Sequence, residues 1–362
     1  MRPEFHDLEL ETKPDFLQAM ERVYAWFEGE LLDRVPVRFS GHNEEFNIVD
    51  STMKWESVRD RWFDVEYRVE RFLENVRTKP FLGETFPVFW PNLGPNVLAA
   101  ILGGELEFGD VTSWIHPFVS TEEQASQIGL NRNSPYYRKL RELTAYALER
   151  CSHQFMVGYT DMHPGLDCAD AMVGTTELCL AMYDDPEFVT TLVERVHPAF
   201  LELMGEFHGV LHGAGQLSVT WMGIPSFETM HIPSCDLGVM ISEETFQEFA
   251  LPVIIRESRE FRHNIFHVDG KGVARHVDAL LDVDTIQAYQ WVQGVGLDRP
   301  IMQSLDFIRK VQNKMRGVVV DLQTDELEPF IREMSPQGIY LSINESDVEV
   351  QRTILRRLES WR

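Results

Sequence analysis

The stretch Phe266-His267-Val268-Asp269-Gly270-Lys271-Gly272 ends a predicted strand at 263–267 and precedes a predicted helix at 273–281. His267 and Asp269 are two residues apart, so on an extended strand end both side chains point the same way. An imidazole and a carboxylate aimed together can bind a divalent ion, share a proton or hold a polar substrate. Such a pair can also simply close a turn. The stretch therefore predicts a strand-to-helix transition that carries either a functional site or a structural turn.

The same strand-then-helix unit recurs along the chain. Eight apolar stretches with strand character begin near residues 35, 86, 155, 216, 263, 284, 317 and 338. The helices that follow them are predicted at 57–76, 134–150, 186–211, 242–262, 273–281, 303–312, 324–334 and 347–361. Eight such units predict an α/β fold of the (β/α)8 TIM-barrel type. A doubly wound open sheet is the rival, but Ser40-Gly41-His42-Asn43 is not its glycine-rich phosphate turn.

Two segments fall outside the repeating unit. An amphipathic helix predicted at 14–32 precedes the first strand and is expected to lie outside the strands that follow. The excursion 96–133 is too short to hold a core of its own, which indicates an insertion or lid. We therefore expect a single domain over residues 1–362.

Composition narrows the class of function. A formal charge of −25 disfavours a nucleic-acid partner and an anionic membrane surface. The first residues lack the apolar run of a signal peptide, and no later segment resembles a membrane span. Four cysteines without a CxxC pair indicate reduced thiols. We therefore expect a cytoplasmic protein that acts on a small molecule.

Chemistry-bearing residues follow each predicted strand, at the end where barrel enzymes hold their active sites. In chain order they are His42, Trp90, Asp161, His163, Trp221, Cys235, Asp236, His267, Asp269, Gln290, Trp291, Asn344 and Glu345. This pattern favours an enzyme over a binding scaffold. The tryptophans can wall a pocket for a planar or methylated ligand, or pack in the core or rim. Asp161 and His163 can bind a ligand or stabilise a turn.

The chain resembles the uroporphyrinogen decarboxylase superfamily, which includes zinc-dependent methyltransferases that act on corrinoid-bound or thiol methyl groups. The resemblance covers most of the chain and is carried by four segments: Asp33-Arg34-Val35-Pro36-Val37, 165–174 followed by Asp184-Asp185-Pro186-Glu187, 236–252, and His267-Val268-Asp269-Gly270. It implies a barrel with its active site at the strand ends.

The decarboxylases of this superfamily grip substrate carboxylates with an amino-terminal arginine-rich segment beside an essential aspartate. Here the corresponding stretch, 38–45, lacks paired arginines and adds Glu44 and Glu45. A porphyrinogen with many carboxylates would be repelled by this charge. A carboxy-lyase that acts on a tetrapyrrole or another small carboxylate is therefore the alternative, with Asp236 or Asp161 steering protonation.

The methyltransferases resemble one another in a His-x-Cys pair and a late cysteine that hold zinc. His267 matches the histidine, Asp269 takes the cysteine position, and the late position falls near Asn344 or Glu345. Oxygen in place of sulfur gives a harder and more Lewis acidic site, which can activate a bound water or hydroxyl as well as a thiol. Without a metal, His267 and Asp269 can act as an acid–base pair.

The sequence thus predicts a methyltransferase that moves a methyl group between a small donor and a corrinoid protein or thiol. The resemblance implies that zinc or another divalent metal is held by His267, Asp269 and Glu345, and that the corrinoid is carried by a partner protein. Catalysis is assigned to His267, Asp269, Asp161 and Asp236. The predicted substrate contacts are His42, Trp90, His163, Trp221, Cys235, Gln290, Trp291 and Asn344. A homodimer is compatible with this prediction, and a catalytically dead barrel that serves as a subunit is the third hypothesis.

Overall fold

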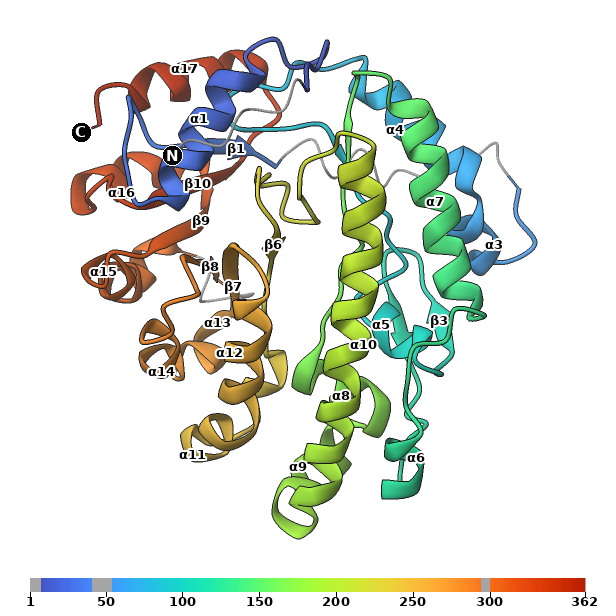
Figure 1. Ribbon diagram of the computed structural model, residues 1–362. Coiled ribbons are helices and arrows are strands. Elements are labelled where there is room, and N and C mark those ends of the chain that lie inside the picture. Colours follow the sequence, from blue (N-terminus) through green and yellow to red (C-terminus); the bar gives the residue numbers. More distant parts are fainter. Residues whose placement is uncertain (1–7, 41–53, 294–299, 362) are drawn as a thin grey trace.

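In the computed structural model, which describes residues 8–40, 54–293 and 300–361, six parallel strands form one curled sheet. The strands lie in the order β1-β10-β9-β8-β7-β6. Their bounds are β1 Val37–Phe39, β6 Met230–His231, β7 His263–Asp269, β8 Ala288–Val292, β9 Gly317–Gln323 and β10 Ile339–Asn344. A separate two-stranded parallel sheet contains β2 Val88–Phe89 and β5 Met156–Val157. Helices surround these strands on the outside (Figure 1).

The two parallel sheets lie next to each other without a continuous hydrogen-bonded ladder. The backbone N–H of Glu84, just before β2, donates to Val37 O of β1 at 2.7 Å. Side chains take other ladder positions: Glu84 Oε2 accepts from Val37 N, and Gln216 Oε1 accepts from Val157 N at 2.8 Å. The α/β class is therefore confirmed, whereas the expected closed eight-stranded barrel is seen only as a curled six-stranded sheet with a two-stranded neighbour.

The fourth predicted strand, at 216–220, was wrong in its position. In that region Ser218 and Ser226 form an isolated antiparallel bridge. The strand that pairs with β7 is instead β6, in which Met230 lies opposite His263. Residues 216–220 do not form a ladder strand, although Val219 O accepts from Tyr159 N at 2.7 Å and Gln216 Oε1 accepts from Val157 N of β5.

Most predicted helices are present, and the longest of them illustrates the local sequence signals that made them predictable. Helix α10 (Pro186–Gly213) begins with proline at its first turn, and Asp185 caps it by accepting from Phe188 N at 3.2 Å. The predicted helix 57–76 is divided because Asp64 ends α3 and caps α4. The remaining helices are α1 Phe16–Phe27, α3 Val58–Phe63, α4 Val65–Val76, α5 Val97–Ile101, α6 Glu122–Ser126, α7 Pro135–Cys151, α8 Gly165–Val173, α9 Thr175–Asp184, α11 Glu243–Thr245, α12 Leu251–Arg259, α13 Gly270–Ala274, α14 Val277–Leu281, α15 Leu305–Asn313, α16 Leu327–Glu333 and α17 Val348–Leu358.

Helix α1 closes the amino-terminal end of the curled sheet. Trp26 Nε1 donates to Gly338 O at 2.8 Å, immediately before β10. The ring of Phe27 stacks on His263, the first residue of β7, with a centroid distance of 4.1 Å. The helix therefore lies across the strand ends opposite those that carry the predicted site.

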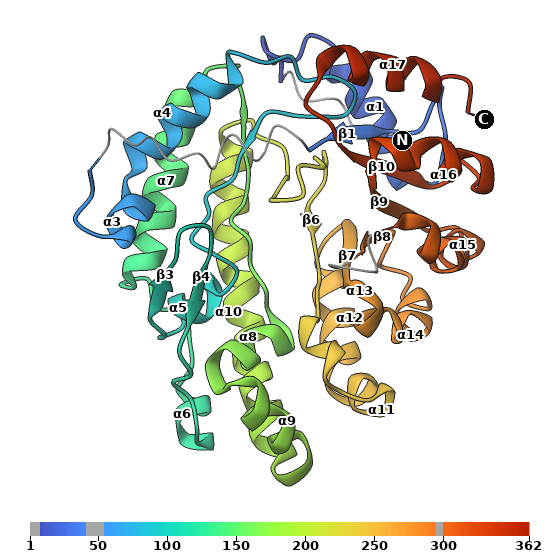
Figure 2. The same cartoon turned by 180° about the vertical axis from the view of Figure 1, so that it is seen from behind.

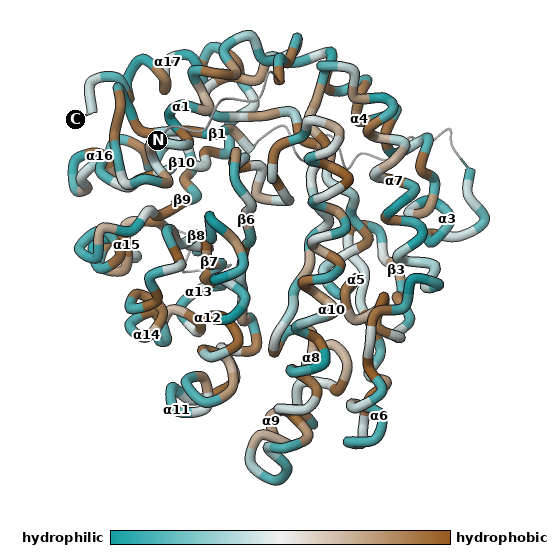
Figure 3. Tube along the Cα trace, viewed as in Figure 1, coloured by the Kyte–Doolittle hydropathy of each residue, from teal (hydrophilic) through white to brown (hydrophobic). Residues whose placement is uncertain are grey.

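The interior of the curled sheet is packed with side chains. Ile265 lies opposite Ala288, and Val319 lies opposite Tyr340, and all four belong to one buried cluster with α1. Alternate residues on the same strands join a larger cluster under the outer helices. Figure 3 shows hydrophobic residues along β8 and β9 and hydrophilic residues at the outer turns of α9 and α11.

The excursion 96–133 packs against helix α8. It contains α5 and a hairpin of β3 (Leu106–Phe108) and β4 (Ser113–Ile115), which Figure 2 shows next to each other, followed by α6. Phe118 N and Val119 N both donate to Met172 O of α8. A lid function for this excursion stays a prediction.

None of the helices in the described parts of the chain combines the length and the apolar character that spanning a lipid bilayer requires.

Candidate active site

The carboxyl ends of β5, β6 and β7 bring a group of polar side chains together. Asp161 and His163 lie in the segment after β5, and Asp167 lies in the first turn of α8. Asp236 follows β6, and His267 lies near the end of β7. Because β6 and β7 are parallel neighbours, their carboxyl ends lie side by side. The contact between His163 and Ser234 joins the segment after β5, which belongs to the other sheet, to these ends.

His163 is the centre of a hydrogen-bond network. Its Nε2 lies 2.9 Å from Asp161 Oδ2, and its Nδ1 lies 3.0 Å from Ser234 Oγ. Ser234 Oγ donates to Asp167 Oδ2 at 2.7 Å, and Leu237 N donates to Asp167 Oδ1 at 3.2 Å. The imidazole is thereby held between two carboxylates, one directly bonded and one reached through a hydroxyl.

The charged forms of the histidine and the carboxylates in this network stabilise one another. Burial alone would lower the pKa of His163, but the carboxylates of Asp161 and Asp167 raise this pKa well above its ordinary value. Burial likewise opposes ionisation of Asp167, yet His163 and the hydroxyl of Ser234 hold the pKa of that carboxyl below its ordinary value. The protonated form of the His163 imidazole is therefore stabilised by its contacts with Asp161 and Asp167.

Asp236 lies next to this network, and one of its carboxylate oxygens has no hydrogen-bond partner among the described residues. Burial, reinforced by the negative charge of Asp167, raises the pKa of Asp236 to about 6, whereas coulombic interactions with His267 and His163 oppose the rise. Its Oδ1 is buried and accepts no hydrogen bond within the described residues. A buried carboxylate oxygen without a partner is available to an ion, a ligand or its own proton.

Among the residues that the structure describes, His163, Asp167 and Asp236 form the one group of three potential ligands whose donor atoms all lie within 4.8 Å of one another. One nitrogen and two carboxylate oxygens suit zinc or another divalent ion of intermediate hardness. The unpartnered oxygen of Asp236 adds to this fit, so these residues can hold a divalent metal. Binding requires His163 to lose its proton, because a metal ligand must be unprotonated.

The metal set predicted from the sequence is arranged differently. Glu345 Oε2 accepts from Thr324 Oγ1 at 3.1 Å, and its Oε1 accepts from Asp347 N at 2.8 Å, so this carboxylate stabilises the turn after β10. Together with His267 and Asp269, it does not form a group of close donor atoms in the described chain. Metal binding by that set stays a prediction.

His267 is oriented by two neighbours. Its Nδ1 lies 2.7 Å from Gln290 Oε1, and the indole of Trp221 meets its ring edge-on at a centroid distance of 5.5 Å. Since the amide oxygen can only accept, Nδ1 carries the proton and Nε2 keeps its lone pair in the neutral ring. His267 is half-buried and Asp269 is exposed.

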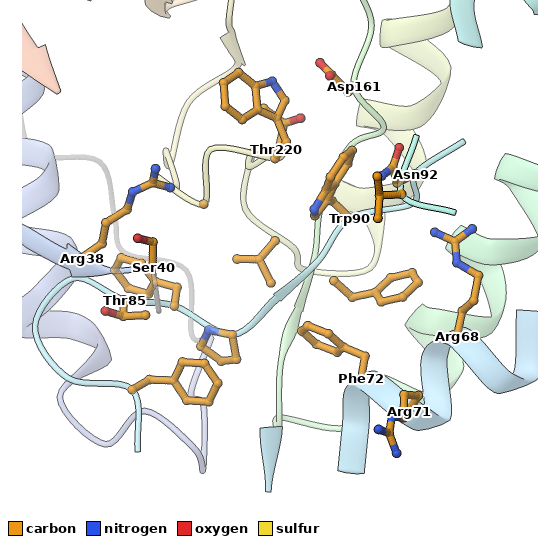
Figure 4. A pocket seen from close by; sticks show the side chains of 18 of the residues that line it. Arg38, Ser40, Arg68, Arg71, Phe72, Thr85, Trp90, Asn92, Asp161 and Thr220 are labelled. Carbon is orange, nitrogen blue, oxygen red and sulfur yellow. The ribbon is translucent and has the colours of Figure 1, made fainter. Parts of the chain in front are cut away.

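A cavity of about 490 Å³ opens next to these residues. Asp161, Trp221 and Trp90 line it, as the sequence predicts for a substrate site, and Figure 4 shows Asp161 and Thr220 at one end. Its other walls come from β1, α3, α4 and the segment around β2. This volume is in the range of small-molecule sites.

Other predicted substrate contacts are placed elsewhere. Trp291 is 2% exposed and packs on Phe307 of α15 at a centroid distance of 4.5 Å, so its side chain faces away from the interior. Cys235 is buried, and burial raises the pKa of its thiol well above the ordinary value, which leaves it unreactive. Asn344 is exposed and outside the cavity lining, and His42 lies outside the described residues.

Sequence reasoning missed two parts of the site. Asp167 is absent from the predicted site residues, and its position four residues after His163 at a helix start was the available signal. The second part is a set of arginines that line the cavity: Arg38, Arg61, Arg68 and Arg71. Three of them lie on α3 and α4, far in sequence from the strand ends.

No protein-family model matches the chain, and no curated protein sequence matches it significantly. Solved structures do match it. One is described as a methyltransferase from Methanosarcina mazei, with a TM-score of 0.61 and 13% sequence identity over 96% of this chain and 98% of that chain. At this identity the likeness shows that the two chains share a fold along nearly their whole lengths.

Proposed function

We propose that this chain is a methyltransferase of the uroporphyrinogen decarboxylase superfamily, which moves a methyl group between a small donor and a corrinoid protein or thiol. The observation that carries the proposal is the group of Asp161, His163, Asp167 and Asp236 beside a cavity at the strand ends. The shared fold with a methyltransferase from Methanosarcina mazei supports it.

His163, Asp167 and Asp236 are the residues that would hold a divalent metal. When bound, such an ion supplies Lewis acidity to the group that gives or receives the methyl. Asp161 orients the imidazole of His163 through Nε2. Nδ1, which lies 3.9 Å from Asp167 Oδ2, is the nitrogen that would face the ion in place of Ser234. Leu237 N fixes Asp167 by donating to the carboxylate.

His267 and the cavity walls supply the remaining functions. Gln290 holds the ring so that Nε2 can accept a proton from a thiol or hydroxyl in the site. Trp221 and Trp90 provide flat apolar surfaces that exclude water from a bound ligand.

Methylcobalamin and 2-mercaptoethanol are suitable probes for this reaction, because the visible spectrum reports loss of the cobalt-bound methyl group. We expect thiol-dependent demethylation by the purified protein supplied with zinc. Asp236→Asn should lower the rate at least about tenfold, which corresponds to about 1.4 kcal/mol of transition-state stabilisation. No demethylation under any tested divalent metal would count against methyl transfer.

A carboxy-lyase is the second candidate, and the state of Asp236 favours it. With a pKa of about 6, this carboxyl is partly protonated near neutral pH and can donate a proton to a carbon that loses carbon dioxide. Incubation with a porphyrinogen and measurement of released carbon dioxide distinguishes the two candidates.

A further inference from the structure

One side of the cavity is lined by guanidinium groups, although the protein carries a formal charge of −25. Arg38 comes from β1, Arg61 from α3, and Arg68 and Arg71 from α4. Of these four, only Arg61 takes part in an ion pair within the described chain. Its partner is Asp110, at 3.5 Å, and the carboxylate of Asp110 is 86% exposed. The other three guanidiniums lack a carboxylate partner among the described residues.

Arg68 is the guanidinium best placed to receive a ligand. Its Nη1 donates to Trp62 O at 3.0 Å, and the guanidinium lies 5.7 Å from the centre of the Trp62 ring. Burial lowers its pKa to about 10, and no charge from the described residues offsets this effect. Figure 4 shows its guanidinium directed towards Trp90 and Asn92. A half-buried cation without a counter-charge is disfavoured unless an anion arrives with a ligand.

Arg71 provides an independent observation of the same kind. It lies on α4 three residues after Arg68 and also lines the cavity. Its Nε is buried and has no hydrogen-bond partner within the described chain. Unsatisfied buried donors are uncommon in folded proteins, so a missing acceptor is the simplest account of this one.

Between the arginines and the polar group, the cavity wall is apolar. Phe72, Phe89 and Trp90 all line it, and Phe72 meets Phe89 edge-on at a centroid distance of 5.5 Å. Asp161 and Trp221 also line it and belong to the candidate active site. In Figure 4 Arg68 and Phe72 lie on one side and Asp161 at the top of the cavity. A ligand with a charged end and an apolar body fits this cavity, because the arginines can pair with the charged end and the aromatic wall can contact the apolar body.

We propose that the cavity binds a small organic anion, a carboxylate, sulfonate or phosphate, whose charged group pairs with Arg68. Its apolar body lies against Phe72, Phe89 and Trp90, and its other end reaches Asp161. Guanidinium forks suit such groups because they can donate two parallel hydrogen bonds. The inference that an anion binds depends only on the residues that line the cavity. The inference that this anion is a substrate of the active site rests on the proposed function.

Calorimetric titration with benzoate and benzenesulfonate, with the neutral benzamide as the matched probe, tests the proposal. We expect both anions to bind the full-length protein at least about tenfold more tightly than benzamide, with affinity falling as salt is raised. Arg68→Met should weaken anion binding at least about tenfold. Arg77→Met, at the end of the same helix and hydrogen-bonded to Gln154, should leave it unchanged.

Two further variants keep the test decisive if Arg68→Met does not fold. Arg71→Met should also weaken anion binding, and Arg68→Lys should retain most of it, because the charge remains. Equal binding of benzoate and benzamide, no binding of either anion, or wild-type affinity in both methionine variants of α4 overturns the proposal. The titration measures binding and not turnover. If the protein binds the anions but transfers no methyl group, the proposed function is refuted and the anion-binding proposal is not.

Discussion

His267 Nδ1 lies 2.7 Å from Gln290 Oε1, and the pairing of β7 with β8 sets this contact by placing the two residues directly opposite each other. The contact fixes which ring nitrogen carries the proton. It also fixes the rotation of the ring, since Trp221 meets it edge-on. The strand register therefore determines which nitrogen of His267 faces the site.

Gln290→Leu removes the acceptor and leaves the ring free to rotate and change tautomer. If the chain transfers methyl groups as proposed, we expect turnover to fall about tenfold or more, as is usual when the partner of a functional histidine is lost. Gln290→Glu, which restores an acceptor, should recover much of the loss. Steady-state kinetics on the folded variants provide the measurement, and equal kcat in wild type and Gln290→Leu would remove His267 from the mechanism.

The neighbouring residues Gln290 and Trp291 show where sequence reasoning succeeds and where it stops. Both were predicted as substrate contacts because both end the same strand. Side chains alternate along a strand, so only one of the two can face the interior. Gln290 does so, and Trp291 packs under α15. The sequence predicts where the strand lies. Which side of the sheet each side chain faces depends on the strand register, and neighbouring strands set that register.

Helix positions were easier to predict than sheet closure, for a physical reason. Caps such as Asp185 and the apolar periodicity of α10 are local signals, and the structure confirms that helix. The breaks in the sheet depend on contacts such as Gln216 with Val157, which are distant in sequence and use a side chain. The cavity arginines were missed for a related reason: Arg68 and Arg71 come from α4, and only tertiary packing brings them to the strand ends.

The metal site gives a prediction that distinguishes two sets of ligands. If His163, Asp167 and Asp236 bind a divalent ion, Asp167→Asn and Asp236→Asn should each weaken zinc binding at least about tenfold, because a direct ligand is lost. Asp269→Asn and Glu345→Gln should retain wild-type metal content. Elemental analysis after dialysis against zinc measures this. Metal loss confined to the last two variants would support the set predicted from the sequence.

Glu257 and His231 give a prediction about pH. Glu257 Oε2 lies 3.9 Å from His231 Nε2, and both side chains are buried. Burial raises the pKa of Glu257 to about 8 and lowers the pKa of His231 to about 3. Both groups are therefore neutral at pH 7, and the contact is not an ion pair.

The sign of the Glu257 effect follows from these values. In the unfolded chain this carboxyl loses its proton near its ordinary pKa of 4.5, whereas the folded protein keeps it up to about 8. The free energy of unfolding should therefore fall as pH rises from about 4.5 to about 8. Glu257→Gln should remove this slope and raise stability at pH 7 by about 1–3 kcal/mol.

Urea unfolding of wild type and Glu257→Gln at several pH values between these limits tests the assignment. Glu260→Gln is the matched control, because Glu260 lies on the same segment and is exposed. An unchanged pH slope in Glu257→Gln would mean that Glu257 is ionised in the folded protein.

The last prediction concerns Glu84, which joins the first strand to the segment before β2. Its carboxylate is fully buried and accepts from Arg34 Nη1 at 2.7 Å and from Val37 N at 2.7 Å. It also accepts from Arg22 Nη1 at 3.2 Å, and Arg22 pairs in turn with Asp33. The Asp33-Arg34 segment, one carrier of the family resemblance, is thus part of a buried ionic network at the amino end of β1.

Glu84→Gln leaves the two buried guanidiniums of Arg22 and Arg34 short of a counter-charge and weakens the link between the two parallel sheets. We expect it to lower the free energy of unfolding by about 3–5 kcal/mol, as is typical when one partner of a buried ion pair is removed. Asp33→Asn should cost only about 1 kcal/mol, because the Asp33 carboxylate is 53% exposed. Urea denaturation with unchanged m-values provides the measurement. A loss of stability no larger in Glu84→Gln than in Asp33→Asn would show that the segment before β2 is held to β1 by apolar packing instead.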